Sequence, residues 1–335
     1  MSWNVDNTAD RQVECDSIAE QIRSWNWIVG GQYRLVDMMG KGSFANVYSA
    51  VNITDEADLV AVKISHERSE DTLVAEAKVY DKLFGLKGIP RTRMYVKERR
   101  CGALVMDLLG PSLGNLKDYC GHFSLKTVFM LADQMISRLA SLHSRGYIHG
   151  DLKEDNFILG RQETIDERTV YLVDFGLAKT FLLTNGEHIA PKTGLNPCGT
   201  LRYTSLNCTL GNEISRRDDI ESLGYLLIYL HRGDLPWILA ESVVGGDEKR
   251  RLMADIKLHT PVKKLCEGLP DEFFAYITYC RSLRFDEQPD YARLRLLCEV
   301  AMHRLDYEID GIFDWTIRLR DDLEWKRLLA LEDVF

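Results

Sequence analysis

One short segment of the chain gathers side chains that suit the transfer of a phosphoryl group. Such a reaction needs an acceptor for the proton of the attacking hydroxyl, a cation near the transferred phosphate, and oxygen ligands for Mg²⁺. Asp151 supplies the first, Lys153 the second, and Asn156 with Asp174 the third. The two strings read His149-Gly150-Asp151-Leu152-Lys153-Glu154-Asp155-Asn156 and, 18 residues further on, Asp174-Phe175-Gly176.

A glycine-rich turn earlier in the chain could bring backbone N–H groups against phosphates. It reads Gly-Lys-Gly-Ser-Phe-Ala-Asn-Val from Gly40, and Gly40 and Gly42 leave the backbone uncovered. Taken alone, the turn is equally typical of an ordinary hairpin. Beyond it, Lys63 ends a strand-like run and can hold the α- and β-phosphates of ATP, while Glu76 can pair with Lys63. Lys63 or Glu76 alone would be typical of a solvated surface charge. The nucleotide site is indicated by the order and spacing of the turn, the lysine and the glutamate along the chain.

The elements around this turn have the texture of a small sheet. Short runs of β-type residues, separated by glycines and acidic turns, predict an antiparallel meander. Leu73, Ala77, Tyr80 and Leu83 recur at helical spacing and predict one helix on it. The predicted strands are 33–39, 46–51, 59–65, 93–96 and 103–108, and the predicted helix is 73–84.

Beyond Gly110 and Pro111 the pattern becomes largely helical. Apolar residues at spacings of three and four predict a helical second part, interrupted by an irregular stretch over 147–210 with short strands at 157–159 and 170–173. Residues 1–30 fit one amphipathic helix or a flexible appendage, and leucines after 316 fit a terminal helix that docks on the second part or binds a partner. The predicted helices of the second part are 125–144, 218–232, 248–259, 271–282 and 291–305.

Length and composition exclude several classes of protein. The 335 residues, 45% hydrophobic and 28% charged, suffice for a large core. A net charge of −9 disfavours direct binding of nucleic acid by blanket phosphate neutralisation. The longest apolar run, residues 223–230, is far shorter than the ~20 residues of a membrane span, and no secretory or lipidation signal is visible. Eight scattered cysteines contain no C-x-x-C pair and are expected to be reduced.

With these motifs in view, the chain resembles the eukaryotic protein kinases, and more narrowly the casein kinase 1 family, over residues 31–316. The resemblance implies an α+β, bilobed protein kinase fold with a small antiparallel N-lobe, one main helix and a mostly helical C-lobe. The ranges it implies are an N-terminal extension over 1–30, an N-lobe over 31–107, a C-lobe over 108–316 and a helical tail over 317–335. The narrower match rests on 108–113 (Leu-Leu-Gly-Pro-Ser-Leu), 199–207 (Gly-Thr-Leu-Arg-Tyr-Thr-Ser-Leu-Asn), 215–225 (Ser-Arg-Arg-Asp-Asp-Ile-Glu-Ser-Leu-Gly-Tyr), 233–237 (Gly-Asp-Leu-Pro-Trp) and 280–291 (Cys-Arg-Ser-Leu-Arg-Phe-Asp-Glu-Gln-Pro-Asp-Tyr).

The resemblance also assigns roles around the nucleotide. Met106 would be the gatekeeper behind the adenine, and the backbone of 107–109 would meet the adenine edge. Asp219 would anchor the catalytic loop from below. The apolar residues that the resemblance assigns to the adenine ring are equally typical of an ordinary hydrophobic core. The implied nucleotide-binding residues are Gly40, Gly42, Val47, Ala61, Lys63, Met106, Asp107, Leu109 and Ile158, beside the catalytic Asp151, Lys153, Lys63 and Glu76 and the metal ligands Asn156 and Asp174.

Substrate choice is the least specified feature. The family is similar in preferring Ser or Thr downstream of acidic or phosphorylated residues, which implies a substrate anion site at Arg202 and Lys179, with residues 249–251 as a possible extension or a plain solvated cluster. Gly150 replaces the Arg expected before the catalytic Asp. This departure argues against an activation-loop phosphate switch and weakens phosphate-primed recognition.

The resulting expectation is an ATP- and Mg²⁺-dependent protein serine/threonine kinase that is constitutively active. The alternatives are a small-molecule phosphotransferase, suggested by the His-Gly-Asp string, and a pseudokinase scaffold, suggested by Gly150. Family analogy implies a monomer in the cytoplasm or nucleus that acts on protein substrates and binds neither membranes nor nucleic acid.

Overall fold

The computed structural model describes residues 27–66, 69–98, 101–242 and 245–322. Most of the predicted N-terminal helix and the end of the predicted tail helix lie outside these residues. The chain divides into two compact units, Met1–Phe84 with Pro90–Leu109 and Gly85–Ile89 with Gly110–Phe335, called here the sheet unit and the helical unit.

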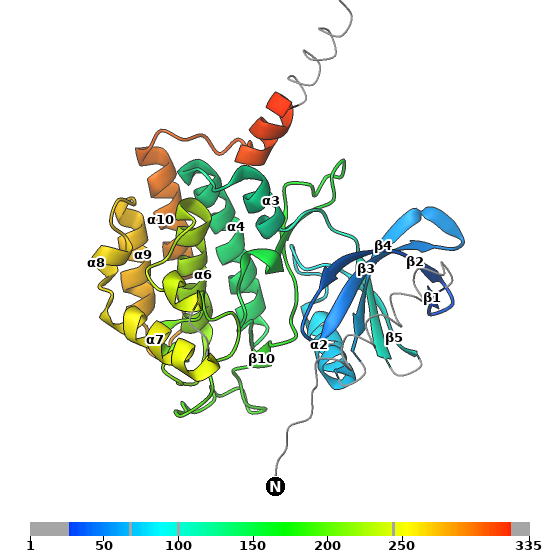
Figure 1. Ribbon diagram of the computed structural model, residues 1–335, viewed down its shortest axis with the longest axis horizontal. Helices are drawn as coiled ribbons and strands as arrows, with labels where there is room; N and C mark the ends of the chain where they lie inside the picture. The colour runs from blue at the N-terminus through cyan, green and yellow to red at the C-terminus, as the bar shows by residue number, and fades with distance from the viewer. Residues whose placement is uncertain (1–26, 67–68, 99–100, 243–244, 323–335) are drawn as a thin grey trace, which may run out of the picture. The chain divides into compact units, whose positions relative to one another are not determined.

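The sheet unit is a six-stranded sheet in the order β1-β2-β3-β4-β6-β5, with every neighbouring pair antiparallel (Figure 1). The chain enters helix α2 (Glu70–Leu83) after β4 and then adds β5 at the edge beyond β6, so the predicted meander is interrupted once. The predicted strands and their helix are confirmed. The strands are β1 (Ile28–Val29), β2 (Tyr33–Lys41), β3 (Ala45–Asn52), β4 (Asp55–Ser65), β5 (Thr92–Glu98) and β6 (Cys101–Asp107).

One face of this sheet carries the apolar core of the unit. Tyr48 pairs with Val62 and Val62 with Val105, and residues directly opposite each other in a ladder point to the same face. All three are almost fully buried, and the partly buried Trp27 and Met94 pack against the same cluster. Because side chains alternate along a strand, the residues between them face the opposite side, where the predicted nucleotide-binding residues lie.

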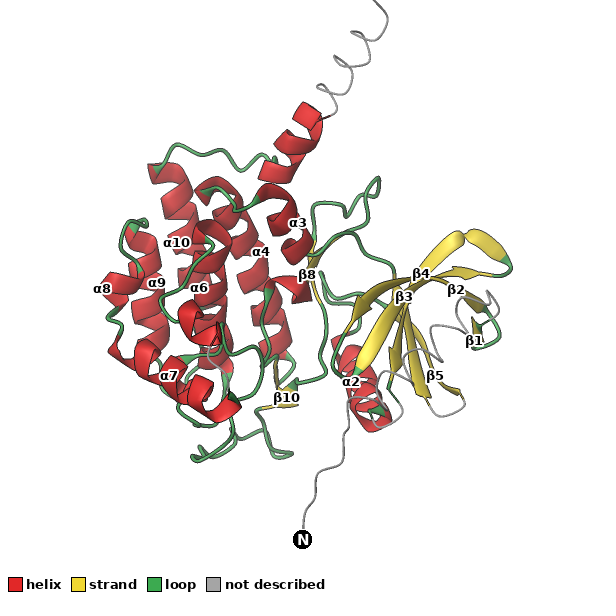
Figure 2. Cartoon of the chain, viewed as in Figure 1, coloured by secondary structure: helices red, strands yellow, loops and turns green. Residues whose placement is uncertain are grey.

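Four packed helices form the centre of the helical unit, and all helices are coloured red in Figure 2. Helices α4 and α10, α4 and α6, and α6 and α9 are packed against one another. Gly224 lets α6 and α9 approach closely, since a Cβ atom there would lie 2.6 Å from the Ile277 side chain. The helices are α3 (Leu113–Cys120), α4 (Leu125–Ser144), α5 (Leu206–Thr209), α6 (Arg216–Arg232), α7 (Gly246–His259), α8 (Val262–Leu265), α9 (Asp271–Ser282) and α10 (Tyr291–Arg304), with helical turns η1 (Glu154–Asn156) and η2 (Ile238–Ser242) and a further helix over 314–322.

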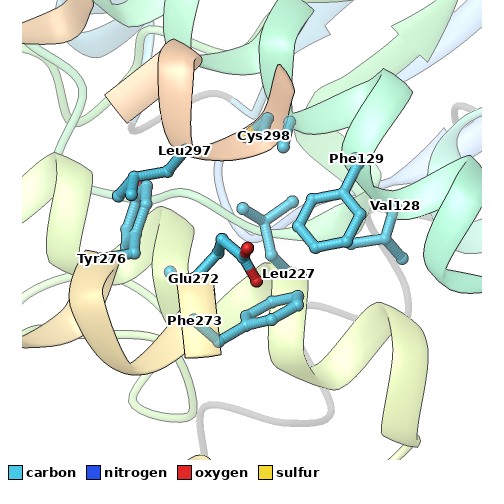
Figure 3. A pocket seen from close by; sticks show the side chains of 10 residues that line it. Val128, Phe129, Leu227, Glu272, Phe273, Tyr276, Leu297 and Cys298 are labelled. Carbon is cyan, nitrogen blue, oxygen red and sulfur yellow. The ribbon is translucent and has the colours of Figure 1, made fainter. Parts of the chain in front are cut away.

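A small pocket lies where these four helices meet. Figure 3 shows its apolar lining, including Phe129, Leu227 and Phe273, with the Glu272 carboxylate among them. Glu272 is paired with Arg304 at 3.0 and 2.8 Å, so the charge at the edge of the core is neutralised. The pocket is therefore a packing feature of the helical core.

The five long predicted helices of this unit are confirmed, two of them with the same bounds. Their ends follow local chemistry: the Ser124 hydroxyl accepts a hydrogen bond from the Thr127 N–H at the start of α4, and Gly233 adopts a left-handed φ of 74° at the end of α6. Helix α3 and the four-residue helices α5 and α8 were not predicted. None of the helices in the described part of the chain is long and apolar enough to cross a bilayer.

Two short antiparallel pairs break the helical pattern, β7 (Tyr147–Ile148) with β10 (Lys179–Thr180) and β8 (Phe157–Leu159) with β9 (Val170–Leu172). The predicted strands 157–159 and 170–173 are thereby confirmed. Residues 85–89 group with the helical unit because the Gly88 carbonyl accepts from the Leu172 N–H at 2.8 Å. The buried Arg138 side chain lies against Gly88, where a Cβ atom would come within 1.9 Å of it.

Candidate active site

The register of the sheet brings five of the predicted nucleotide-binding residues to one face. Gly40 pairs with Val47 and Val47 with Lys63, while Ala61 pairs with Met106. Ala61 and Lys63 are two residues apart on β4, so all five side-chain positions lie on the face opposite the apolar core. Ala61 and Met106 are buried there and Val47 is half-buried.

Lys63 and Glu76 form the predicted ion pair within the sheet unit. The Lys63 Nζ lies 2.9 Å from Glu76 Oε1 and 2.7 Å from Oε2, and the Glu76 side chain is 2% exposed. A glutamate buried in this way requires a charge partner. Helix α2 therefore holds the lysine ammonium at the face that carries the other predicted nucleotide residues.

The glycine-rich turn is closed by its own backbone. The Gly42 N–H donates to the Ala45 carbonyl at 2.9 Å, and a Cβ atom at Gly42 would lie equally close to that oxygen. Residues 41–44 are exposed, as a turn that approaches a ligand with its backbone would be. At the far end of β6 the Asp107 carboxylate binds Arg93 and the Arg91 N–H, which turns this side chain toward β5.

In the helical unit the loop 149–156 is anchored by Asp219. One carboxylate oxygen accepts the His149 N–H at 2.7 Å and binds His143 Nε2 at 2.8 Å, and the other accepts the Gly150 N–H at 3.0 Å. Burial raises the pKa of the Asp219 carboxyl, but the interactions with His143, His149 and the Gly150 N–H together outweigh it, and the net pKa lies below the ordinary value. The anchoring role implied for Asp219 is confirmed.

Asp151 projects from this anchored loop and is held on one side by Thr200. The Thr200 N–H and hydroxyl donate to Asp151 Oδ1 at 2.6 and 2.7 Å, and the Lys153 Nζ lies 3.6 Å from Oδ2. The Asp151 side chain is 13% exposed and that of Lys153 28%. This arrangement fixes Oδ1 of the carboxylate and leaves Oδ2 beside the Lys153 ammonium.

The two predicted Mg²⁺ ligands lie on adjacent strand ends of the helical unit. The Asn156 carbonyl accepts from the Val173 N–H at 3.0 Å, next to Asp174, and the Asn156 amide donates to the Asp151 carbonyl at 2.8 Å. Asp174 has a left-handed φ of 66°, a conformation that costs energy for a residue with a side chain. An amide oxygen and a carboxylate are oxygen ligands that suit Mg²⁺, so the donor set fits the ion. Ile158, half-buried on β8, completes the predicted nucleotide residues of this unit.

The two residues of the predicted anion site are engaged by carboxylates of the chain itself. Arg202 Nε and Nη2 donate to Glu241 at 2.9 and 2.6 Å. The Lys179 ammonium is paired with Glu213. Both cations of the predicted anion site are therefore paired with acidic side chains of the chain itself.

Several residues of this region were missed at the level of sequence. Lys257 on α7 is completely buried and donates to the carbonyls of Leu201 and Thr204 at 2.8 and 2.7 Å. Burial lowers its pKa to about 7. The one feature of the sequence that could have indicated the burial of Lys257 is its position four residues after Met253, on the same side of the helix. The contact of Thr200 with Asp151 had no signal beyond the place of Thr200 in the string 199–207, and Glu241, which lies outside every such string, had none.

The described residues hold no group of three or more His, Cys, Asp or Glu side chains arranged to bind a metal. A comparison with protein families finds that residues 33–274 match the model of the protein kinase domain. The match spans both units and includes every predicted site residue.

Proposed function

The chain belongs to the protein kinase family, and on this premise we propose that it is a serine/threonine kinase of casein kinase 1-like character. The α+β protein kinase fold, with an antiparallel sheet unit and a helical unit, agrees with the expectation from the sequence. ATP with Mg²⁺ would supply the phosphoryl group. The residues proposed to hold the nucleotide are Gly40, Gly42, Val47, Ala61, Lys63, Met106, Asp107, Leu109 and Ile158, with Asn156 and Asp174 as metal ligands.

The observation that carries the proposal is the environment of Asp151. Its Oδ1 is saturated by Thr200, so Oδ2 is the oxygen able to accept the proton of a substrate hydroxyl. Lys153, 3.6 Å from that oxygen, would stabilise negative charge that develops on the attacking oxygen. A serine or threonine hydroxyl is far less acidic than a phenol, whose pKa is about 10, so it gains more from such a cation.

A network behind the segment 199–207 supports a protein as the substrate. The Ser205 hydroxyl donates to Asp218 at 2.6 Å, and the Leu206 N–H donates to Glu221 at 3.2 Å. Lys257 holds the same segment from the other side. These buried contacts build a fixed platform beside Asp151, on which an extended peptide with acidic or phosphorylated residues upstream of its target could lie. We further propose that the protein acts as a monomer in the cytoplasm or nucleus.

The enzyme should be competent without phosphorylation of its own loop. The position that would grip a loop phosphate is Gly150, and the loop is already pinned by Asp219 and Thr200. The His-Gly-Asp string also favours a second candidate, a small-molecule phosphotransferase, which would not need the platform at 199–207.

The test is transfer of radiolabelled phosphate from ATP to casein and to matched peptides that differ only in Ser, Thr or Tyr. We expect label on Ser and Thr and a fall of about 10²–10⁴ in turnover for Asp151→Asn with nucleotide binding retained. Asp255→Asn, an exposed carboxylate on α7, is the matched control. Label only on tyrosine, or consumption of ATP only with sugars, choline or aminoglycosides, would refute the proposal.

A further inference from the structure

The Arg202 guanidinium and the Glu241 carboxylate form a two-point ion pair on the helical unit. Nε donates to Oε1 at 2.9 Å and Nη2 donates to Oε2 at 2.6 Å. This is the fork geometry in which arginine also binds phosphate. A carboxylate and a phosphate therefore compete for the same pair of N–H groups.

The remaining donors of Arg202 are also directed at groups of the chain. Nη1 lies 3.5 Å from the Tyr203 hydroxyl and 3.9 Å from the Glu154 carboxylate. The guanidinium stacks on the Tyr229 ring at 4.8 Å from its centroid. The hydrogen bonds that Arg202 donates to Glu241 are the main cause that raises the pKa of Arg202, which therefore stays charged.

The pair is held in place by the structure around it. Trp237, one residue before η2, is fully buried and its Nε1–H donates to the Arg202 carbonyl at 2.7 Å. Its ring packs on Tyr225 at 4.9 Å and below the Lys257 ammonium at 5.0 Å. The segment that carries Glu241 is thus fixed to the segment that carries Arg202, and the contact is not a chance meeting of two surface side chains.

The pair is nevertheless accessible, since the side chains of Arg202 and Glu241 are 25% and 26% exposed. It also lies close to the reaction centre in the chain, because Arg202 follows two residues after Thr200, which binds Asp151. Two other cations of the helical unit are also paired with carboxylates: Lys179 with Glu213, and Arg250, which lies 3.5 Å from Asp247.

We propose that Glu241 is a specificity-determining residue that occupies the anion site of Arg202 and so prevents recognition of a phosphate on the substrate. This inference rests on the proposed kinase function and narrows its substrate class, because with the site occupied an upstream phosphate gives no advantage over an unmodified residue. In Glu241→Gln the amide keeps the size of the side chain but carries no charge, and one of its two terminal atoms is a donor that cannot accept from Arg202.

The first experiment compares kcat/KM for pairs of serine peptides, each pair with phosphoserine or serine at one upstream position. We expect the ratio to stay within about threefold of one for the natural chain and to rise at least about tenfold for Glu241→Gln, the scale of one charge-assisted hydrogen bond. Glu267→Gln, an exposed glutamate paired with Lys264, is the matched control and should leave the ratio unchanged. A natural chain that already prefers phosphopeptides tenfold, or a variant with an unchanged ratio, would overturn the inference.

A second measurement does not depend on catalysis. Inorganic phosphate, compared with chloride at equal ionic strength, should raise the melting temperature of Glu241→Gln more than that of the natural chain or of Glu267→Gln. Adding Arg202→Lys to Glu241→Gln should abolish this increment, because lysine lacks the fork. If the natural chain transfers no phosphate to any peptide, the proposed function fails, while the phosphate-dependent shift still supports or overturns occupation of Arg202 by Glu241.

Discussion

Replacing Asp219 with Asn should loosen the catalytic loop and lower the stability of the helical unit together. In the natural chain the 3%-exposed carboxylate serves three donors, at 2.7, 2.8 and 3.0 Å. An asparagine has one accepting oxygen. In the better orientation of the asparagine side chain, this oxygen still accepts hydrogen bonds from His143 and from the His149 N–H. The NH₂ group then faces the Gly150 N–H, so two donors meet and that hydrogen bond is lost.

The magnitude follows from these contacts. One charge-assisted hydrogen bond of about 1.5–3 kcal/mol is lost, and two others become neutral bonds about half as strong. Relief from burying a charge offsets part of the loss. We therefore expect the free energy of unfolding to fall by about 3 kcal/mol, and the melting temperature to fall by roughly 6–12 °C for a unit of this size.

The pH dependence gives an independent check. The pKa of Asp219 is lower in the folded protein than in the unfolded chain, so its contribution is present above the unfolded pKa of about 4 and is lost as the pH falls through the folded value. The stability difference between the natural chain and Asp219→Asn should accordingly shrink below pH 4.

Thermal unfolding by circular dichroism, combined with the peptide phosphorylation assay, tests this reasoning. Asp133→Asn is the control, because its pair with Arg295 is about half exposed and should contribute less than about 1 kcal/mol. A melting temperature within about 2 °C of the natural value at pH 7, with full phosphoryl transfer, would show that Asp219 does not anchor the loop.

Three further substitutions test other contacts. Lys63→Met removes the ammonium 2.7 Å from the buried Glu76. It should lower the free energy of unfolding of the sheet unit by about 2–4 kcal/mol and abolish most phosphoryl transfer. Thermal unfolding and the peptide assay measure the two effects, and unchanged values would contradict the role of the pair. Lys257→Met leaves the buried carbonyls of residues 201 and 204 without their donor, so the free energy of unfolding measured in urea should fall by about 2–4 kcal/mol. An equally stable variant would mean that other donors replace the lysine. The hydrogen bond from Cys208 lowers the pKa of the Cys198 thiol below its ordinary value, so iodoacetamide should label Cys198 at a lower pH than it labels an ordinary thiol. A Cys208→Ala variant should shift this midpoint upward, and a midpoint at or above that of an ordinary thiol in the natural chain would refute the reasoning.

The long, strongly periodic elements were predictable from the sequence because their apolar spacing reports burial directly. Helices α4 and α9 have the predicted bounds. Helix α3 was missed because Gly114 and Asn115 in its first turn weaken the helical pattern, while its capping box uses Asn115 instead of the usual Glu or Gln. Helices α5 and α8 have only four residues, too few for a periodic pattern.

Within the candidate site, the residue types were predictable but their partners were not. Phosphoryl transfer restricts the choice of Asp151, Lys153, Asn156 and Asp174, so their order in the sequence already carries the chemistry. The Arg202–Glu241 pair joins residues 39 positions apart, and nothing local selects that glutamate among its neighbours. Sequence therefore identified a cation and left open whether the chain itself neutralises it.

The glycine before Asp151 shows why a departure from a family pattern needs the structure. From sequence, Gly150 signified only the loss of an arginine. In the structure it has φ 77°, and a Cβ atom there would lie 3.2 Å from the Ile214 side chain and 3.3 Å from the Leu177 carbonyl. Gly199 also has a positive φ, and its Cβ would lie 2.4 Å from the Gly150 carbonyl. The two glycines thus let two backbones meet beside Asp151, which brings Thr200 within 2.6 Å of its carboxylate and fixes the loop.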